Sequence, residues 1–184
     1  NTLKRYERAM ICYDQAISAN DEENLRLEKA RMLIFLEEYE EVIEWLSGLS
    51  KDQINGELLY LKARAFHGLA RNSEAIIALT NGIARGAGEE SHILKASILS
   101  EDGKYAEAMV CFGRKDLSAK ALTTKAEIEF KFEKPEALDT VQKALEKDGG
   151  WLPAWKLLGD IHLSRGEHKG ASDAYDSAIG IDEN

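Results

Sequence analysis

The sequence contains few cysteines, few prolines and no long apolar run. Only two cysteines and two prolines occur in 184 residues. So few prolines, in a chain where Ala, Leu, Glu and Lys dominate, favour helices over strands and argue against disorder. The apolar runs are short, such as residues 32–36, and none approaches the roughly 20 residues of a membrane span. We therefore expect an all-α protein that does not insert into a membrane.

Positive charge is also in short supply. The chain has 24 Lys and Arg against 33 Asp and Glu, which gives a net charge of −9 at pH 7. Nucleic-acid binding is built on clustered Lys and Arg that neutralise phosphates, so we expect no nucleic-acid partner. The 44% of hydrophobic residues is ample for a continuous buried core. Because the chain begins with Asn1 rather than Met, we expect it to be a fragment of a longer protein.

What the sequence does contain is an internal repeat. Small residues in similar surroundings recur at intervals of 33, 33, 30 and 33 residues. They are Ala30, Ala63, Ala96, Ala126 and Gly159. Self-similarity at a fixed period of roughly 20 to 50 residues is typical of a solenoid, in which each repeat packs on its neighbours.

A second series of small or apolar residues indicates a second helix in each repeat. Its members are Ala9, Val42, Ala75, Ala108, Ala137 and Ala171. Both series lie in stretches of helical period, so the small residues are predicted to mark crossings where two helices approach closely. We expect a half-repeat at residues 1–21 and repeats at about 22–54, 55–87, 88–117, 118–150 and 151–184. From Ala108 to Ala126 is 18 residues, whereas Ala75 to Ala96 is 21, which predicts a shortened second helix and a bend in the fourth repeat.

The two cysteines, Cys12 and Cys111, occupy the same position in two repeats that lie three repeats apart in the sequence. Helices that pack about 8 to 10 Å apart would separate them by roughly 30 Å. A disulfide needs Cα atoms within about 7 Å of each other. We therefore expect free thiols and a reducing compartment, the cytoplasm.

The last repeat carries a recognisable motif. It reads Trp155-x2-Leu158-Gly159-x2-His162, followed by Ala171-x3-Tyr175 and Ala178. This resembles the tetratricopeptide pattern W-x2-L-G-x2-Y, A-x3-F, with histidine in place of the tyrosine. Weaker versions occupy the other repeats, so the resemblance covers essentially the whole chain. It implies a single domain over residues 1–184, an all-α right-handed superhelix of about five and a half helix-turn-helix repeats.

Residue patterns for chemistry are missing from the sequence. None of the four histidines pairs with another at the spacing of metal ligands. The glycines at 82, 86 and 88 follow a predicted helix and indicate its end rather than a phosphate loop. Neither cysteine has a histidine at a matching repeat position, so a nucleophilic site is not supported. We expect no enzyme activity, no cofactor and no metal.

The resemblance also implies a binding surface. In such proteins the first helix of each repeat lines a concave groove that holds a peptide. Taken from the position of the small residue, the residues predicted to line it here are Leu27, Arg31, Ile34, Tyr60, Arg64, His67, Ile93, Ser97, Ser100, Thr123, Glu127, Phe130, Lys156, Asp160 and Leu163. Charge changes sign along this set. Its N-terminal half has the arginine and tyrosine that often anchor interfaces, which favours a partner with an acidic segment, although a merely solvated helix face would look the same.

We interpret the chain as a non-catalytic scaffold that binds a protein or peptide in this groove. The chaperone-tail clamp of some related proteins needs a Lys and Asn set that no three successive helices carry here. Two alternatives stay open. The chain could be a regulatory or targeting domain of a larger enzyme, or it could self-associate through its N-terminal half-repeat, whose apolar face around Leu3, Met10 and Ile17 would lack a preceding helix.

Overall fold

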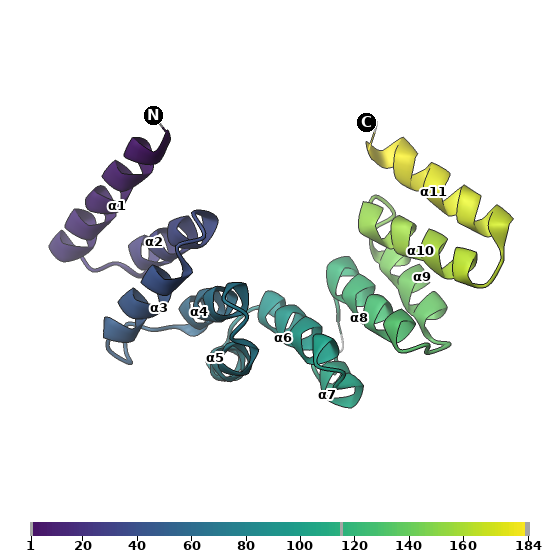
Figure 1. The fold of residues 1–184 in the computed structure, drawn as a ribbon, viewed down its shortest axis with the longest axis horizontal. Coiled ribbons are helices and arrows are strands. Elements are labelled where there is room, and N and C mark those ends of the chain that lie inside the picture. The colour runs from purple at the N-terminus through teal and green to yellow at the C-terminus, as the bar shows by residue number, and fades with distance from the viewer. Residues whose placement is uncertain (1, 115, 183–184) are drawn as a thin grey trace. The chain divides into compact units, whose positions relative to one another are not determined.

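The computed structural model describes residues 2–114 and 116–182, which form eleven α-helices and no strand within these ranges (Figure 1). The all-α expectation is therefore confirmed. In chain order the helices are α1 (Thr2–Ala19), α2 (Glu23–Phe35), α3 (Tyr39–Gly48), α4 (Gly56–Gly68), α5 (Asn72–Ala84), α6 (Glu89–Glu101), α7 (Tyr105–Val110), α8 (Ala119–Lys131), α9 (Ala137–Lys147), α10 (Leu152–Ser164) and α11 (His168–Asp182). The chain divides into two compact units, residues 1–92 and 93–184, each of which is described by itself.

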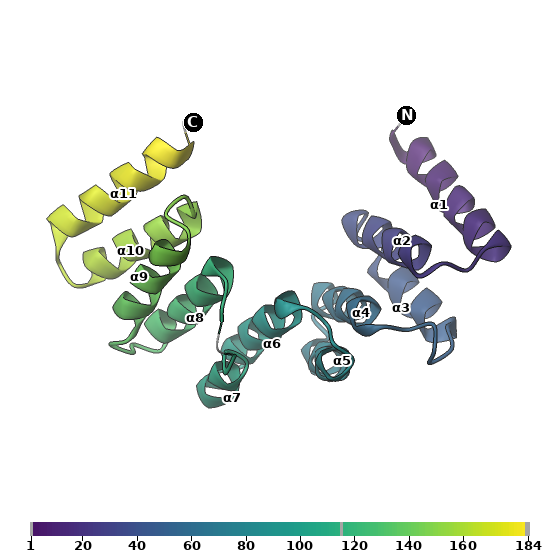
Figure 2. The same ribbon diagram turned by 180° about the vertical axis from the view of Figure 1, so that it is seen from behind.

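After α1, the helices follow one another as pairs joined by short turns. The pairs α4 with α5, α8 with α9 and α10 with α11 each pack closely, and α10 and α11 lie side by side in both views (Figure 1, Figure 2). Helix α7 has only 6 residues, against 10 in α3 and 13 in α5. The predicted shortening of the second helix in the fourth repeat is therefore confirmed, and the predicted bend stays a prediction.

The turn after each first helix is built in one way throughout. The residue seven positions after the small residue has a positive φ at Glu37, Ala70, Gly103, Glu133 and Gly166. In each turn the next N–H donates to the carbonyl five residues back, for example Arg71 to Phe66 at 2.8 Å. This is the Schellman motif, which ends a helix through one left-handed residue. Three of the five positions hold a residue other than glycine, the usual occupant.

The small residues lie at helix crossings, as predicted. Ala30, Ala63, Ala96 and Ala126 are each 0% exposed. At Gly159 the approach is closer still, because an added Cβ would lie 2.3 Å from the ring of Tyr175 on α11. No real Cβ tolerates such a contact, so glycine is required unless the ring moves.

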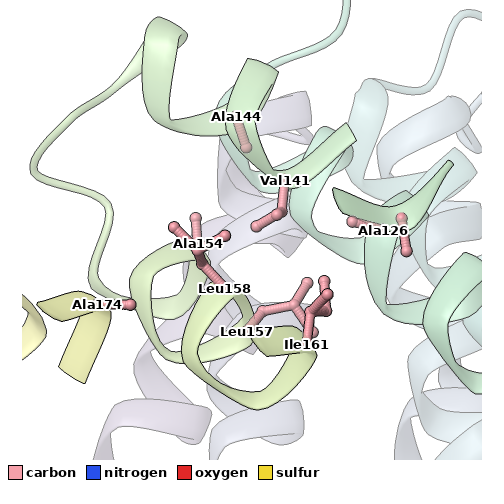
Figure 3. Close-up of a cluster of buried hydrophobic side chains, with 9 residues drawn as sticks. Ala126, Val141, Ala144, Ala154, Leu157, Leu158, Ile161 and Ala174 are labelled. Carbon is pink, nitrogen blue, oxygen red and sulfur yellow. The ribbon is translucent and has the colours of Figure 1, made fainter. Parts of the chain in front are cut away.

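Each unit has its own apolar core. In unit 1 the core joins α2, α3 and α4 through residues such as Leu33, Leu46 and Leu58. In unit 2, Ala126 of α8, Val141 of α9, Leu158 of α10 and Ala174 of α11 belong to one cluster, shown in Figure 3. Within each unit, helices of two successive repeats therefore contribute side chains to one core, as a solenoid requires.

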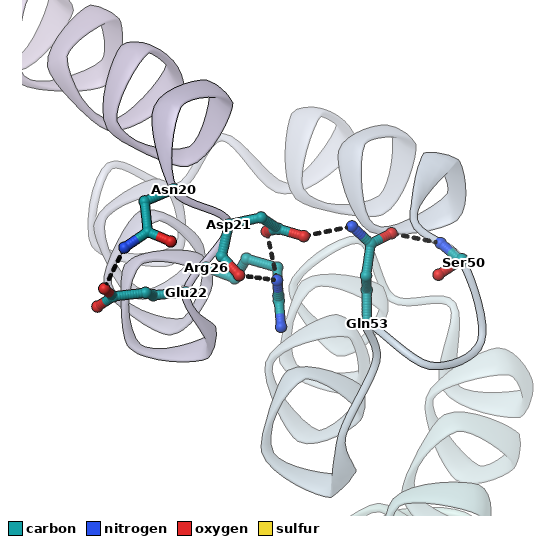
Figure 4. A network of polar contacts seen from close by, with 6 residues as sticks. All are labelled: Asn20, Asp21, Glu22, Arg26, Ser50 and Gln53. Carbon is teal, nitrogen blue, oxygen red and sulfur yellow. Dashed lines mark hydrogen bonds and ion pairs between the residues drawn. The ribbon is translucent and has the colours of Figure 1, made fainter.

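Two charged residues of α2 are buried in unit 1. Arg26 donates to the carboxylate of Asp21, and the Nε2 of Gln53 donates to the same carboxylate at 2.6 Å (Figure 4). These two bonds, from Gln53 and then Arg26, hold the pKa of Asp21 below its ordinary value. The network connects the turn before α2 with the loop after α3, and thus fixes one repeat against the next.

Lys29 is the second buried charge of α2, and only 4% of it is exposed. Its Nζ donates to a carboxylate oxygen of Asp14 on α1 at 2.5 Å and lies 4.7 Å from the ring centroid of Trp45 on α3. A buried ammonium is tolerated only with partners of this kind. Lys29 thereby joins three helices.

Two further expectations concern the thiols and the membrane. Cys12 is exposed, Cys111 is buried, and both are free, as predicted. Burial raises the pKa of the Cys111 thiol. None of the helices within the described ranges combines the length and the apolar character needed to cross a bilayer.

Candidate functional site

In unit 1 the predicted groove residues lie on α2 and α4, which pack against each other. Helix α4 begins where the side-chain oxygen of Asn55 accepts a hydrogen bond from the N–H of Leu58 at 2.8 Å. From this start, Tyr60, Arg64 and His67 follow at spacings of four and three residues. Such a spacing places them on one face of the helix.

The two arginines of this face are not equivalent. Arg31 contacts two carboxylates, Glu28 at 2.8 Å on its own helix and Glu57 at 3.6 Å on α4. Arg64 is exposed, and its guanidinium forms no ion pair with any residue in the described ranges. Because Arg31 is already neutralised by its neighbours, Arg64 is the stronger candidate for contact with an anionic ligand.

Tyr60 and His67 lie beside Arg64 along α4 and are both half-buried. Burial raises the pKa of the Tyr60 hydroxyl, Glu90 and Glu57 add to this, and Arg64 opposes it. The Nδ1 of His67 lies 3.0 Å from the side-chain oxygen of Asn72 on α5, a hydrogen bond in which Nδ1–H donates. The hydrogen bond orients the His67 ring, and Tyr60 packs partly against the core of unit 1. Beside them, Arg64 is a cation with no ion-pair partner among the described residues.

Four of the predicted groove residues are buried in the structure: Ile34, Ile93, Ser100 and Thr123. Ile34 is 6% exposed and Ile93 is 7% exposed, and Ile34 packs in the core of unit 1. Leu27, Ser97 and Phe130 are half-buried. The surface available for contact is therefore narrower than the sequence pattern suggested.

In unit 2 the corresponding face carries negative charge. Glu127 on α8 and Asp160 on α10 are both exposed. Partial desolvation raises the pKa of Glu127. Asp160 accepts a hydrogen bond of 2.7 Å from the hydroxyl of Tyr175, which raises the pKa of that hydroxyl. Lys156 lies on the same helix and is exposed. This face suits a polar or cationic ligand, in contrast to Arg64 in unit 1.

Unit 2 also has a pocket that the sequence pattern did not reveal. It has a volume of about 510 Å³ and lies between the turn after α8 and the end of α10. Its lining includes Phe130, Lys131, Lys134, Ile161 and Arg165. Of these, only Phe130 was predicted to belong to a site. The three cations stand out on a protein of net charge −9.

A third surface lies at the N-terminal end of unit 1. A pocket of about 480 Å³ is lined by residues that include Tyr6, Met10 and Ile11. Ile11 is 56% exposed and Phe35 is 71% exposed, and the Tyr6 and Phe35 ring centroids are 6.1 Å apart. The side chain of Leu3, which was predicted to belong to this patch, lies outside the described part of the chain. Met10 and Ile17 are half-buried rather than exposed.

Over the described ranges, no three side chains of His, Cys, Asp or Glu are grouped so that they could hold a metal ion. His162, for example, has its Nδ1 within 2.5 Å of a carboxylate oxygen of Glu167. The faces and pockets described above therefore offer shape and charge for the contact with a ligand.

Comparisons with known proteins concern the fold. Residues 1–23 match a family model described as a tetratricopeptide repeat. No curated protein matches. YrrB, a TPR protein whose crystal structure is described as having an unusual peptide-binding site, superposes with a TM-score of 0.62 at 16% identity, over 94% of this chain and 93% of its own.

Two further solved structures are similar in the same way. A fragment of MamA from Desulfovibrio magneticus has a TM-score of 0.68 at 16% identity, over 89% of this chain and 97% of its own. The C-terminal part of a TPR repeat-containing protein from Cytophaga hutchinsonii has a TM-score of 0.72 at 12% identity, over 98% of this chain and 75% of its own. At such identities the similarity concerns the arrangement of the helices.

Proposed function

We propose that this chain is a non-catalytic scaffold that binds a segment of another protein along the first helix of its repeats. This proposal is supported by its tetratricopeptide-repeat fold and by the repeat of that family at residues 1–23. The observation that carries this proposal is the exposed, unpaired Arg64 beside the half-buried Tyr60. Arginine and tyrosine are among the residue types most enriched at the hot spots of protein interfaces. The description of YrrB as having a peptide-binding site supports peptide binding by analogy.

The ligand that fits the face of unit 1 is a segment with a carboxylate. Arg64 would bind this carboxylate, Tyr60 and His67 would contact the adjoining backbone or side chains, and Leu27 would add apolar surface. Arg31 contributes less, because Glu28 and Glu57 already surround it. The face of unit 2, with Glu127 and Asp160, would take a polar or basic segment. Ile34, Ile93, Ser100 and Thr123 are not part of the proposed contact set, because they are buried.

The test is to capture partners with the wild-type chain, to purify one, and to titrate it against single variants. Arg64→Glu should weaken binding about tenfold or more, because it replaces an attraction by a repulsion in a partly desolvated contact. Arg31→Glu should have a smaller effect. Lys51→Glu, which changes the charge equally on an exposed turn of the same unit, should leave the affinity unchanged. Equal effects of Arg64→Glu and Lys51→Glu would show that the ligand binds elsewhere.

Salt provides an independent check on the same complex. Charge attraction between exposed groups is screened over a Debye length of about 8 Å at physiological ionic strength. Affinity of the wild-type chain should therefore fall as salt is raised, and affinity of the Arg64→Glu variant should change less. A complex that is insensitive to salt would argue for apolar recognition.

Self-association is a second candidate, and the exposed Phe35 and Ile11 at the N-terminal end favour it. Large exposed apolar side chains beside a pocket are typical of interaction surfaces. Light scattering over a range of concentrations should then show a mass that increases with concentration. The increase should be absent in the Phe35→Ser variant, and a constant monomer mass for the wild-type chain would eliminate this candidate.

A regulatory or targeting role inside a larger enzyme is compatible with the same binding surfaces. The discriminating observation is whether the binding partner is the catalytic part of the same protein. We further propose that the chain acts in the cytoplasm, since its two free thiols would persist in a reducing compartment.

A further inference from the structure

At two junctions between repeats, one in each unit, an aromatic ring closes the contact. In unit 1 the ring of Tyr39, at the start of α3, packs against Gly68 at the end of α4, so closely that a Cβ on Gly68 would lie 2.6 Å from it. In unit 2 the rings of Tyr105, at the start of α7, and Phe132, just after α8, lie 5.3 Å apart. Each contact joins the start of a second helix to the end of the next first helix.

At the last junction of unit 2 the equivalent positions hold two cations. Lys134 lies three residues before Ala137, as Tyr105 lies three before Ala108. Arg165 lies six residues after Gly159, as Phe132 lies six after Ala126. Like charges cannot close the junction as two rings do. Both residues instead line the pocket of about 510 Å³.

The walls of this pocket are restrained before any ligand arrives. Lys131 donates from Nζ to the backbone oxygen of Ser100 at 2.8 Å, and the Nζ of Lys134 lies 5.0 Å from the ring centroid of Tyr105. The guanidinium of Arg165 has no ion-pair partner among the residues that the structure describes. The two lysines are therefore held by neighbouring groups, so little of their side-chain entropy is lost when an anion binds. Arg165 keeps its hydrogen-bond donors available for that anion.

The remaining lining decides which anion fits. Phe130 and Pro135 supply apolar surface, and Glu133 is the one acidic residue in the lining. A free phosphate would leave this apolar surface uncovered, and a nucleic acid would meet the negative charge of the protein as a whole. An acidic side chain next to an apolar one would satisfy both parts of the pocket.

We propose that this junction pocket binds an acidic residue of a peptide together with the Leu or Phe beside it. Arg165 and Lys134 contact the carboxylate, and Phe130 contacts the apolar side chain. The proposal rests on the proposed function in that the ligand is a protein segment, but it concerns different residues from Tyr60 and Arg64. The pocket shares Phe130 with the predicted groove residues of unit 2.

The experiment selects phage-displayed random heptapeptides on three versions of the chain. These are the wild type, the variant Lys134→Glu with Arg165→Glu, and the control Lys143→Glu with Lys169→Glu. All four residues are exposed and belong to unit 2, so the two double variants carry the same net charge. We expect peptides retained by the wild type and the control, lost on the pocket variant, and rich in Asp or Glu next to Leu or Phe. Their affinity for the pocket variant should be reduced tenfold or more.

Several outcomes would overturn the proposal. The absence of any such peptide class, or a class without acidic residues, would show that the pocket is not an acidic-peptide site. Peptides displaced by inorganic phosphate at constant ionic strength, and unaffected when Ala replaces the Leu or Phe, would indicate a simple anion site. The selected peptides should also bind the Arg64→Glu variant as well as they bind the wild type. Binding at the junction pocket is thereby tested separately from binding at the groove face of unit 1.

Discussion

The Schellman turns allow a prediction about stability: an Ala→Gly change should stabilise the protein at a left-handed turn position but destabilise it inside a helix. Ala70 has a φ of 56°, a left-handed conformation that costs an L-residue roughly 1 to 2 kcal/mol. Its side chain is exposed, so no contact is lost when it is removed. Glycine avoids the steric cost but loses about 0.4 to 1 kcal/mol more backbone entropy on folding. Ala70→Gly should therefore raise the free energy of unfolding by roughly 0.5 to 1 kcal/mol.

The reverse change supplies the matched comparison. Gly103 occupies the equivalent turn of the fourth repeat, with a φ of 76° and open space around it. Gly103→Ala should lower the free energy of unfolding by a similar amount. Ala16→Gly, inside α1, should also be destabilising, by about 1 kcal/mol, because the backbone there is helical. Urea unfolding followed by circular dichroism measures all three. A loss of stability in Ala70→Gly would refute the reasoning, because it would mean that the left-handed conformation is not the main cost.

Three further predictions follow from packing and accessibility. Gly159→Ala should be destabilising by about 1 to 2 kcal/mol, because the steric overlap with Tyr175 outweighs the gain in helix propensity. In a Tyr175→Ala background the same change should be stabilising. A change in the free energy of unfolding of the same sign in both backgrounds would contradict the close contact. Ala63→Leu should cost roughly 1 to 3 kcal/mol by overpacking a helix crossing, and an unchanged urea midpoint would contradict it. Cys12 should react with a maleimide in the native protein while Cys111 reacts only after unfolding, and equal native rates would show that Cys111 is accessible.

The sequence could predict the parts of the fold that depend on local periodicity. The small residues recur because two helix backbones approach each other at the same point of every repeat. The burial of Ala30 and Ala96 therefore follows from their position in the repeat. The short α7 follows from the spacing of Ala108 and Ala126 in the same way. These inferences need only the repeat length and the helical period.

Contacts between residues of different helices could not be predicted in this way. Lys29 is charged, so the sequence pattern favours an exposed position, yet Asp14 from α1 and Trp45 from α3 make its burial possible. Arg31 looks equivalent to Arg64 until Glu57 is seen beside it. In each case the partner belongs to another helix, and the periodicity of one helix contains no information about the charges of the next.

The predicted groove set failed at Ile34 for a geometric reason. A residue four positions after a buried alanine lies on the same helix face as that alanine. The apolar stripe of a packed helix is more than 100° wide, so Ile34 falls inside the stripe that Ala30 defines. Ser100, at the same position of the fourth repeat, is buried too, whereas Leu163 in the last repeat is 51% exposed. Burial at this position therefore also depends on which helix packs beside it.

Because the repeats are built alike, one repeat junction can serve as a control for another. This comparison allows the stability cost of the junction pocket to be measured. An aromatic pair contributes about 0.5 to 1.5 kcal/mol beyond its buried area, and the last junction lacks the pair that Tyr105 and Phe132 form. The double variant Lys134→Tyr with Arg165→Phe should restore it and raise the free energy of unfolding by a similar amount. If the two cations are there to bind an acidic segment, the same variant should lose that binding as it gains stability, which is the usual relation between a functional site and its scaffold. A gain in stability with undiminished peptide binding would mean that Lys134 and Arg165 are not the residues that hold the carboxylate.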